Sequence, residues 1–220
     1  MSIDPAASTS GAAGHDAEVA RPSDSRRDPE QVRENLRSWL ATKVTDPVVE
    51  NVHIPETTGM SSETLLFDAR WDGTDRPLVA RVAPAETAVP VFPTYDLEGQ
   101  ARVMRAVAEH SRVPVPAVHW YEPDPAPLGA PFFVMTRVAG RVPPDVMPYN
   151  FGSWVTEAGD TERAAMQDAC VEVLAGVHDV PPASAGLGPA GTVADAVRAH
   201  LDRQRAYYEW TTRTGGPRSP

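Results

Sequence analysis

The sequence predicts an α+β fold in which five strands form an antiparallel sheet, one helix separates the third strand from the fourth, and further helices follow the fifth. Three observations support this prediction. Three β-favouring segments with tight turns lie within residues 50–83. Apolar residues recur at helical spacing after residue 141. The length of 220 residues, with 41% hydrophobic and 23% charged residues, suits one large or two small globular domains.

The N-terminal part of the chain predicts a tail followed by a helix. Residues 1–27 are rich in Ala, Ser, Asp and Gly, so they bury too little apolar surface to offset the entropy of ordering and are expected to be disordered. Asp28 and Pro29 are typical of a helix start, as N-cap and first helical residue. We expect this helix to end near Val44 and to bury one face, formed by Val32, Leu36, Trp39 and Leu40.

The remaining elements follow from local pattern and turn chemistry. The expected strands are 50–55, 64–71, 77–83, 115–121 and 131–138. A helix capped by Thr94 should run to about Ser111, and two later helices are expected at 162–178 and 193–211. The predicted buried face of the helix after Thr94 consists of Leu97, Ala101, Met104, Val107 and Ala108.

Composition excludes several classes of protein. A net charge of -10 argues against a nucleic-acid partner. No apolar run approaches the ~18 residues of a membrane helix, and no signal peptide is evident, so we expect no membrane partner and a cytoplasmic location. The lone Cys170 forms neither an intrachain disulfide nor a multi-cysteine zinc site, and we expect it to be buried in a helix.

A candidate anion site lies in the first half of the chain. Gly59 lets backbone N–H groups approach an anion, and Ser61 and Ser62 add hydroxyl donors, although in isolation this segment is better explained as an ordinary turn. Arg81 places one charge in an apolar strand and can contact phosphate oxygens with two N–H groups. Glu98 would hold Arg81 by an ion pair if its helix packs against that strand.

A second candidate site is the end of the fifth strand. The main chain of Thr136, Arg137 and Val138 could offer the donor and acceptor that match adenine, and Met135 would line the pocket wall. Core packing is the alternative role for Met135, and it is compatible with the pocket.

Taken together, these segments resemble the aminoglycoside phosphotransferase / choline kinase-like family, in particular its actinobacterial branch, which is related to the kinase-like domain of acyl-CoA dehydrogenase family proteins. The resemblance covers about Pro29 to Pro220. Individual motifs are loose, and their order and spacing carry the likeness. The matching segments are residues 59–67, the strand with Arg81, Glu98, residues 132–141 and residues 173–178.

The resemblance implies a protein kinase-like fold, with a small ATP-binding lobe at 28–140 and the start of a helical large lobe at 141–220. It also implies ATP and Mg²⁺ as cofactors and transfer of the ATP γ-phosphate to a hydroxyl group of a small molecule. Gly59, Ser61 and Ser62 would then lie over the phosphates, with Arg81 in the place of the usual lysine and Glu98 orienting it. The segment from Met135 to Val138 would bind adenine.

The sequence departs from the family after residue 140. The family's next motifs are a His/Trp-Gly-Asp loop followed by Asn, and later a metal-binding Asp; neither occurs here, and no asparagine follows Asn150. These residues position the acceptor hydroxyl and hold Mg²⁺. We therefore assign no catalytic residue and no metal ligand, and predict a C-terminally truncated, inactive chain that binds ATP with a Kd of about 1 mM.

Two alternatives stay open. The chain could be a non-catalytic binding or regulatory module that docks a partner through its small lobe and exposed helices. It could also be an unrelated α+β domain that shares only the strand order. The apolar faces of the later helices predict self-association, and the sequence does not identify the acceptor molecule.

Overall fold

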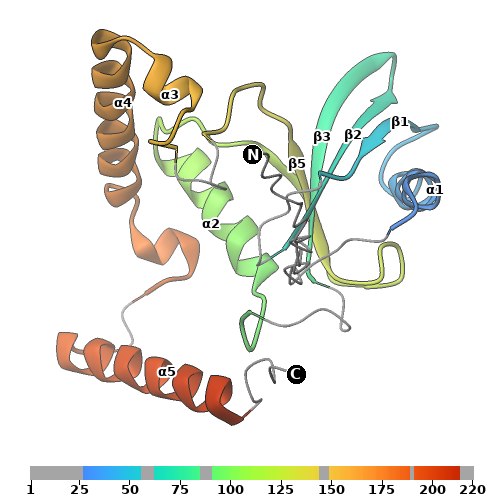
Figure 1. Ribbon diagram of the computed structural model, residues 1–220. Coiled ribbons are helices and arrows are strands. Elements are labelled where there is room, and N and C mark those ends of the chain that lie inside the picture. The colour runs from blue at the N-terminus through green and yellow to red at the C-terminus, as the bar shows by residue number, and fades with distance from the viewer. Residues whose placement is uncertain (1–26, 56–61, 85–90, 144–148, 189–190, 214–220) are drawn as a thin grey trace, which may run out of the picture.

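The computed structural model describes residues 27–55, 62–84, 91–143, 149–188 and 191–213 (Figure 1). It confirms the α+β class, with a five-stranded sheet and separate helices. The elements are α1 Pro29–Leu40, β1 Val48–His53, β2 Glu63–Trp71, β3 Thr74–Val82, α2 Leu97–His110, β4 Val118–Glu122, β5 Phe132–Thr136, α3 Trp154–Glu157, α4 Asp160–His178, the 3₁₀ turn η1 Pro182–Ala185, and α5 Val193–Arg213.

The sheet is antiparallel throughout, in the order β1-β2-β3-β5-β4. β2 and β3 are joined by a tight turn in which Asp72 and Gly73 both adopt positive φ, as the Asp-Gly pair predicts. β5 lies between β3 and β4. After β3 the chain crosses through α2 and forms β4 at the edge of the sheet, and β5 then fills the position between them. As a result, the end of β5 lies next to the start of β3, with Thr136 opposite Leu78.

Helix α1 covers one face of the sheet. Asp28 accepts a hydrogen bond from the N–H of Glu30 at 3.0 Å, which confirms the expected N-cap, and the predicted apolar face of α1 is buried. The face packs on alternate residues of the strands, as the period-2 pattern of a half-buried sheet requires. Its sheet partners include Leu65, Phe67, Leu78, Ala80, Val82, Phe132 and Val134.

Aromatic contacts fix α1 at its C-terminal end. The Trp39 ring meets Phe132 and Trp120 edge-on, with centroid distances of 4.8 and 5.8 Å. Trp39 Nε1 donates to Glu122 at 2.8 Å, and Lys43 Nζ lies 3.3 Å from the same carboxylate. α1 is therefore held to β4 by one polar cluster as well as by apolar packing.

Helix α2 lies against the other face of the sheet (Figure 1). Leu97 and Ala101 pack on Phe133 of β5. The N-cap is Asp96, which accepts from the N–H of Gly99 at 2.7 Å, and not the expected Thr94. Ala106 is buried where the prediction placed Ala108, because the helix is rotated by its contacts with the sheet.

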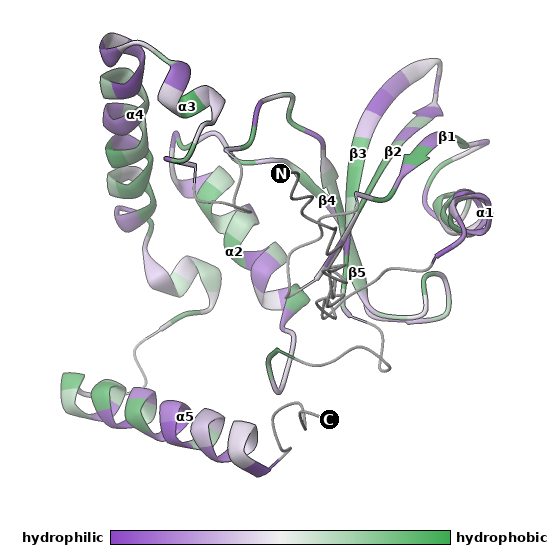
Figure 2. Ribbon diagram, viewed as in Figure 1, coloured by the Kyte–Doolittle hydropathy of each residue, from purple (hydrophilic) through white to green (hydrophobic). Residues whose placement is uncertain are grey.

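The helices after β5 pack far less. Neither α4 nor α5 has a buried residue, although apolar and polar residues alternate along both (Figure 2). Cys170 is exposed, so the expectation of a buried cysteine was wrong: its helix is formed, but none of its residues is buried. Links to the rest of the described chain include η1, where Arg102 of α2 donates to the carbonyl of Ala185 at 2.8 Å, and α5, where the Tyr207 hydroxyl donates to Val91 O at 3.1 Å.

No helix in the described part of the chain is both long and apolar enough to span a membrane. The predicted disordered tail lies outside the described residues, apart from Arg27. The proposed division at residue 140 stays a prediction.

Candidate nucleotide-binding site

Register places the candidate residues on the sheet face opposite α1. Because strand residues alternate between faces, the residues that α1 leaves uncovered form rows across β2, β3 and β5. The middle row is apolar and joins Leu66, Val79 and Met135, of which Leu66 and Met135 are half-buried. A flat apolar ring could therefore lie on this row without displacing the core.

The row on one side of the apolar row contains Arg81, the candidate phosphate-binding residue. Thr64 lies opposite Arg81, and Arg81 opposite Phe133. Arg81 Nε donates to Ser62 Oγ at 2.8 Å, and Ser62 is only 3% exposed. The structure thus brings together two of the predicted residues that lie 19 positions apart. Their bond orients the guanidinium while leaving its two Nη groups free of any hydrogen bond to the described residues.

The structure does not form the predicted ion pair between Arg81 and Glu98. Among the described residues, Arg81 forms no ion pair with Glu98. Glu98 is exposed, because Leu97 and Ala101 turn toward the sheet and the helical rotation of about 100° per residue carries Glu98 away from that face. Glu98 instead lies near Tyr121: burial raises the pKa of the Tyr121 hydroxyl, and the charge of Glu98 adds to the rise.

The end of β5 leaves the N–H of Val138 as a free main-chain donor among the described residues. The N–H of Thr136 donates to Ala117 O and that of Arg137 to Pro77 O, both at 2.9 Å. The N–H of Val138, which is 68% exposed, makes no hydrogen bond within the described residues. The sheet thus uses the N–H groups of Thr136 and Arg137, because β5 continues its ladder for one residue beyond the strand.

The row on the other side of the apolar row, away from Arg81, contains an ion pair that the sequence analysis missed. Arg137 Nη2 and Asp68 Oδ1 are 2.5 Å apart, and Asn51 donates to the other carboxylate oxygen at 2.8 Å. Alternation along β2 puts Asp68 on the same face as Leu66, so its position was available from the pattern. Its pairing with Arg137 was not, since the contact spans 69 residues.

His119 is a second residue that sequence reasoning missed. Its Nε2 lies 2.9 Å from Thr136 Oγ1, and β4, which carries it, is an edge strand of the sheet. Burial lowers the pKa of His119, and the nearby charge of Arg76 lowers it further. The ring is therefore neutral at physiological pH, which suits a hydrogen bond to a hydroxyl group.

Several expected features cannot be placed. Gly59 and Ser61 lie outside the described residues. Within the residues that the structure describes, no three His, Cys, Asp or Glu side chains are grouped so as to hold a metal ion. This part of the chain therefore offers Mg²⁺ no complete set of ligands.

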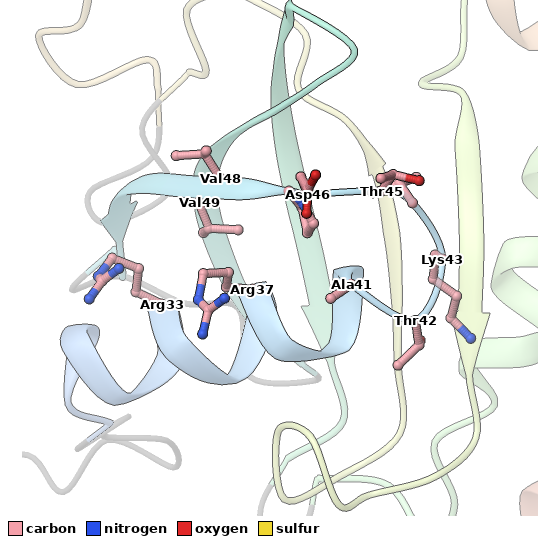
Figure 3. Close-up of a pocket in the computed structure, with 11 residues that line it drawn as sticks. Arg33, Arg37, Ala41, Thr42, Lys43, Thr45, Asp46, Val48 and Val49 are labelled. Carbon is pink, nitrogen blue, oxygen red and sulfur yellow. The ribbon is translucent and has the colours of Figure 1, made fainter.

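A pocket of about 830 Å³ lies away from the candidate site, between the end of α1 and β1 (Figure 3). Arg33 and Arg37 project from α1 toward it. Both arginines already pair with carboxylates of their own helix, Glu34 with each of them and Glu30 with Arg33. The pocket therefore lacks an uncompensated charge for an anionic ligand.

Comparison with known proteins gives the family of a chain with this fold. The model of the phosphotransferase enzyme family matches residues 64–214, so the chain belongs to that family. This confirms the resemblance that the sequence indicated. The match includes β2 with Asp68, β3 with Arg81, and all of the later helices.

Two similar proteins illustrate the relationship. "Probable acyl-CoA dehydrogenase IBR3" of Arabidopsis thaliana is 29% identical over 159 residues, which are 72% of this chain and 18% of that protein. A crystal structure of a "putative aminoglycoside phosphotransferase" from Ralstonia eutropha JMP134 is 26% identical, with a TM-score of 0.47, and the match covers 72% of this chain and 41% of that one. The chain thus spans less than half the length of either protein.

Proposed function

We propose that the sheet of this chain binds ATP as the nucleotide-binding half of a phosphotransferase that acts on a hydroxyl group of a small molecule. The observation that carries the proposal is the Ser62–Arg81 hydrogen bond beside the apolar row of Leu66, Val79 and Met135. Membership of the phosphotransferase family supports the class of reaction.

The rows match the chemistry of a nucleoside triphosphate in order. The Arg81 row and the Arg137 row are separated by four residues along a strand. Because two residues span about 6.8 Å, the two rows are roughly 13 Å apart. Between them the surface is apolar, which suits the faces of adenine. Val138 N–H at one end supplies a donor for a ring nitrogen, and the guanidinium at the other end supplies positive charge for phosphate oxygens.

Arg81 would act by position and charge. An arginine stays protonated at any physiological pH and presents a planar set of donors, so it contacts phosphate oxygens without needing a perturbed pKa. Its bond to Ser62 limits its rotation, which lowers the entropy lost on binding. Gly59 and Ser61 would add backbone and hydroxyl donors above the phosphates.

The 220 residues on their own would bind ATP without transferring phosphate. They contain no Gly-Asp loop followed by Asn and no later metal-binding Asp of the family pattern. Each transition-state contact that is missing commonly costs ~10²–10³ in rate. Mg²⁺ would supply charge neutralisation on the phosphates; the described residues include no group of three His, Cys, Asp or Glu side chains that could hold it.

The test is an ATP titration followed by ¹H–¹⁵N chemical shifts. We expect a Kd of about 1 mM, and an Arg81→Gln change should weaken binding at least tenfold, because it removes the only phosphate-facing charge proposed for the described sheet face. The matched control is Arg70→Gln, which removes the same charge from an exposed residue paired with Asp75. Equal affinities of the two variants would contradict the role of Arg81.

A non-catalytic docking module is the second candidate. The observation in its favour is the exposure of large apolar side chains on α4 and α5, including Leu174 at 55% and Leu201 at 59%. Surfaces of this kind mark interaction sites. Concentration-dependent self-association without any ATP-induced shift would favour this function over nucleotide binding.

A further inference from the structure

A buried ion pair at the start of β2 connects three distant segments of the chain. Arg27 Nε lies 2.5 Å from Glu63 Oε2, and Arg27 Nη1 donates to the carbonyl of Leu128 at the same distance. Arg27 precedes α1, Glu63 is the first residue of β2, and Leu128 lies in the turn that leads to β5. The guanidinium therefore joins the N-terminal segment to both strands that flank β3.

Little solvent reaches this contact. The side chains of Arg27 and Glu63 are 19% and 7% exposed, and Leu128 is 2% exposed. A carboxylate at such a depth is strongly unfavourable without a partner, so removal of Arg27 leaves a charge that must regain water. The simplest way for Glu63 to regain water is for the start of β2 to move outward.

The start of β2 is also where the candidate phosphate contact begins. Ser62, which accepts from Arg81, directly precedes Glu63 in the chain. Glu63 lies opposite Val82, next to Arg81, but its side chain points to the other face of the sheet, because neighbouring strand residues alternate. Any outward movement of Glu63 thus carries Ser62 away from Arg81 without a direct contact between Arg27 and the nucleotide.

We propose that Arg27 is a positioning residue for phosphate binding: it holds Glu63 from the α1 side of the sheet and so keeps Ser62 within hydrogen-bonding distance of Arg81. This inference rests on the proposed function, in which Arg81 contacts the phosphates. Arg27 itself touches no nucleotide atom.

The experiment compares ATP with adenosine, which has the same base and sugar but no phosphate. In Arg27→Met the affinity for ATP should fall about fivefold while that for adenosine stays within twofold, as read from ¹H–¹⁵N chemical shifts. A purely structural defect would weaken both ligands alike and would overturn the inference. The matched control is Arg33→Met, the same substitution at a half-buried arginine of α1 that pairs with Glu30 and Glu34 of its own helix, which should change neither affinity.

A second variant guards against unfolding. Arg27→Met combined with Glu63→Met removes both charges, and such paired replacements are commonly neutral or stabilising for a fold. The double variant should fold and bind ATP within about twofold of the unaltered chain, because no unpaired charge remains to draw the start of β2 outward. A loss of about fivefold that persists in this variant would show that Arg27 does not position the site through Glu63, and would overturn the inference.

Amide exchange separates this inference from the proposed function. If the unaltered chain binds neither ATP nor adenosine, the proposed function fails, and the exchange rates of Glu63 and Thr64 then decide the role of Arg27. Exchange at least tenfold faster in Arg27→Met than in Arg33→Met would support its hold on β2. Equal exchange in the two variants would overturn it.

Discussion

The sheet region and the helical region of this chain have similar apolar residues but opposite burial. Leu36 in α1 is 0% exposed, whereas Leu174 in α4 and Leu201 in α5 are 55% and 59% exposed. Both regions form regular secondary structure. Only the sheet region converts its apolar pattern into a packed core within the described residues.

This contrast shows that amphipathic pattern and burial are separate properties. Local sequence fixes a helix through its caps and periodicity, and α5 has a clear start, in which Thr192 and Asp195 exchange hydrogen bonds. Burial needs a second surface. α1 and α2 find that surface on the two faces of the sheet, whereas the contacts of α4 and α5 bury none of their described residues.

The largest expected effect tests this contrast with one substitution made in each region. Leu36→Ala should lower the free energy of unfolding by about 3 kcal/mol, because it leaves a cavity beneath the sheet. Leu201→Ala should change it by less than about 0.5 kcal/mol, since the side chain is mostly in solvent. Urea denaturation followed by tryptophan fluorescence measures both, and comparable losses would mean that α5 is packed in solution.

An intermediate effect concerns the polar cluster that holds α1 to β4. The hydrogen bond from Trp39, followed by that from the N–H of Asp124, lowers the pKa of Glu122. A carboxyl group with a lowered folded-state pKa stabilises the fold above its unfolded pKa, and this stabilisation is lost as pH falls through the folded value. Glu122→Gln should therefore cost about 1.5 kcal/mol near neutral pH and much less at about pH 3.

The measurement is the urea midpoint of both forms between about pH 3 and pH 7. The two curves should converge toward low pH. The matched control is Glu109→Gln, a change in an exposed carboxylate of α2 whose effect should be small at every pH. Parallel curves for Glu122→Gln and the unaltered chain would contradict the assigned role of this cluster.

The smallest effect is confined to the start of α5. Hydrogen bonds from the side chain and backbone of Thr192 lower the pKa of Asp195, so its contribution is present at neutral pH and is lost in acid, as pH falls through the folded value. Asp195→Asn should speed amide exchange in the first turn of α5 and leave exchange in β3 unchanged. A matching change in β3 would show that the two regions unfold as one unit.

Much of the fold could be predicted because its signals are local. The Asp28-Pro29 start of α1, the Asp72-Gly73 turn and the β-favouring residues of β2 are each signals from a few neighbouring residues, and all three elements were confirmed. The candidate site was only partly predictable. The Ser62–Arg81 contact joins two residues that the sequence had singled out, but as neighbours of the phosphate rather than as hydrogen-bond partners.

The contacts that were wrongly predicted or missed have the same physical cause: each depends on how a helix is placed relative to the sheet, which the local sequence does not fix. Glu98 was expected to reach Arg81, yet the rotation of α2 is set by Leu97 and Ala101 against Phe133, and the local pattern does not fix that rotation. The Arg27–Glu63 pair likewise depends on where the chain enters α1 relative to the sheet.

By itself, the sequence determined the strands, the helices, the apolar face that α1 buries and the family of phosphotransferases to which the chain belongs, because periodicity, turn residues and motif order are all written along the chain. The tertiary structure alone decided which polar groups meet: Arg81 with Ser62, Arg137 with Asp68, and Arg27 with Glu63. A charged side chain can reach many partners, and only the relative placement of whole strands and helices selects one of them.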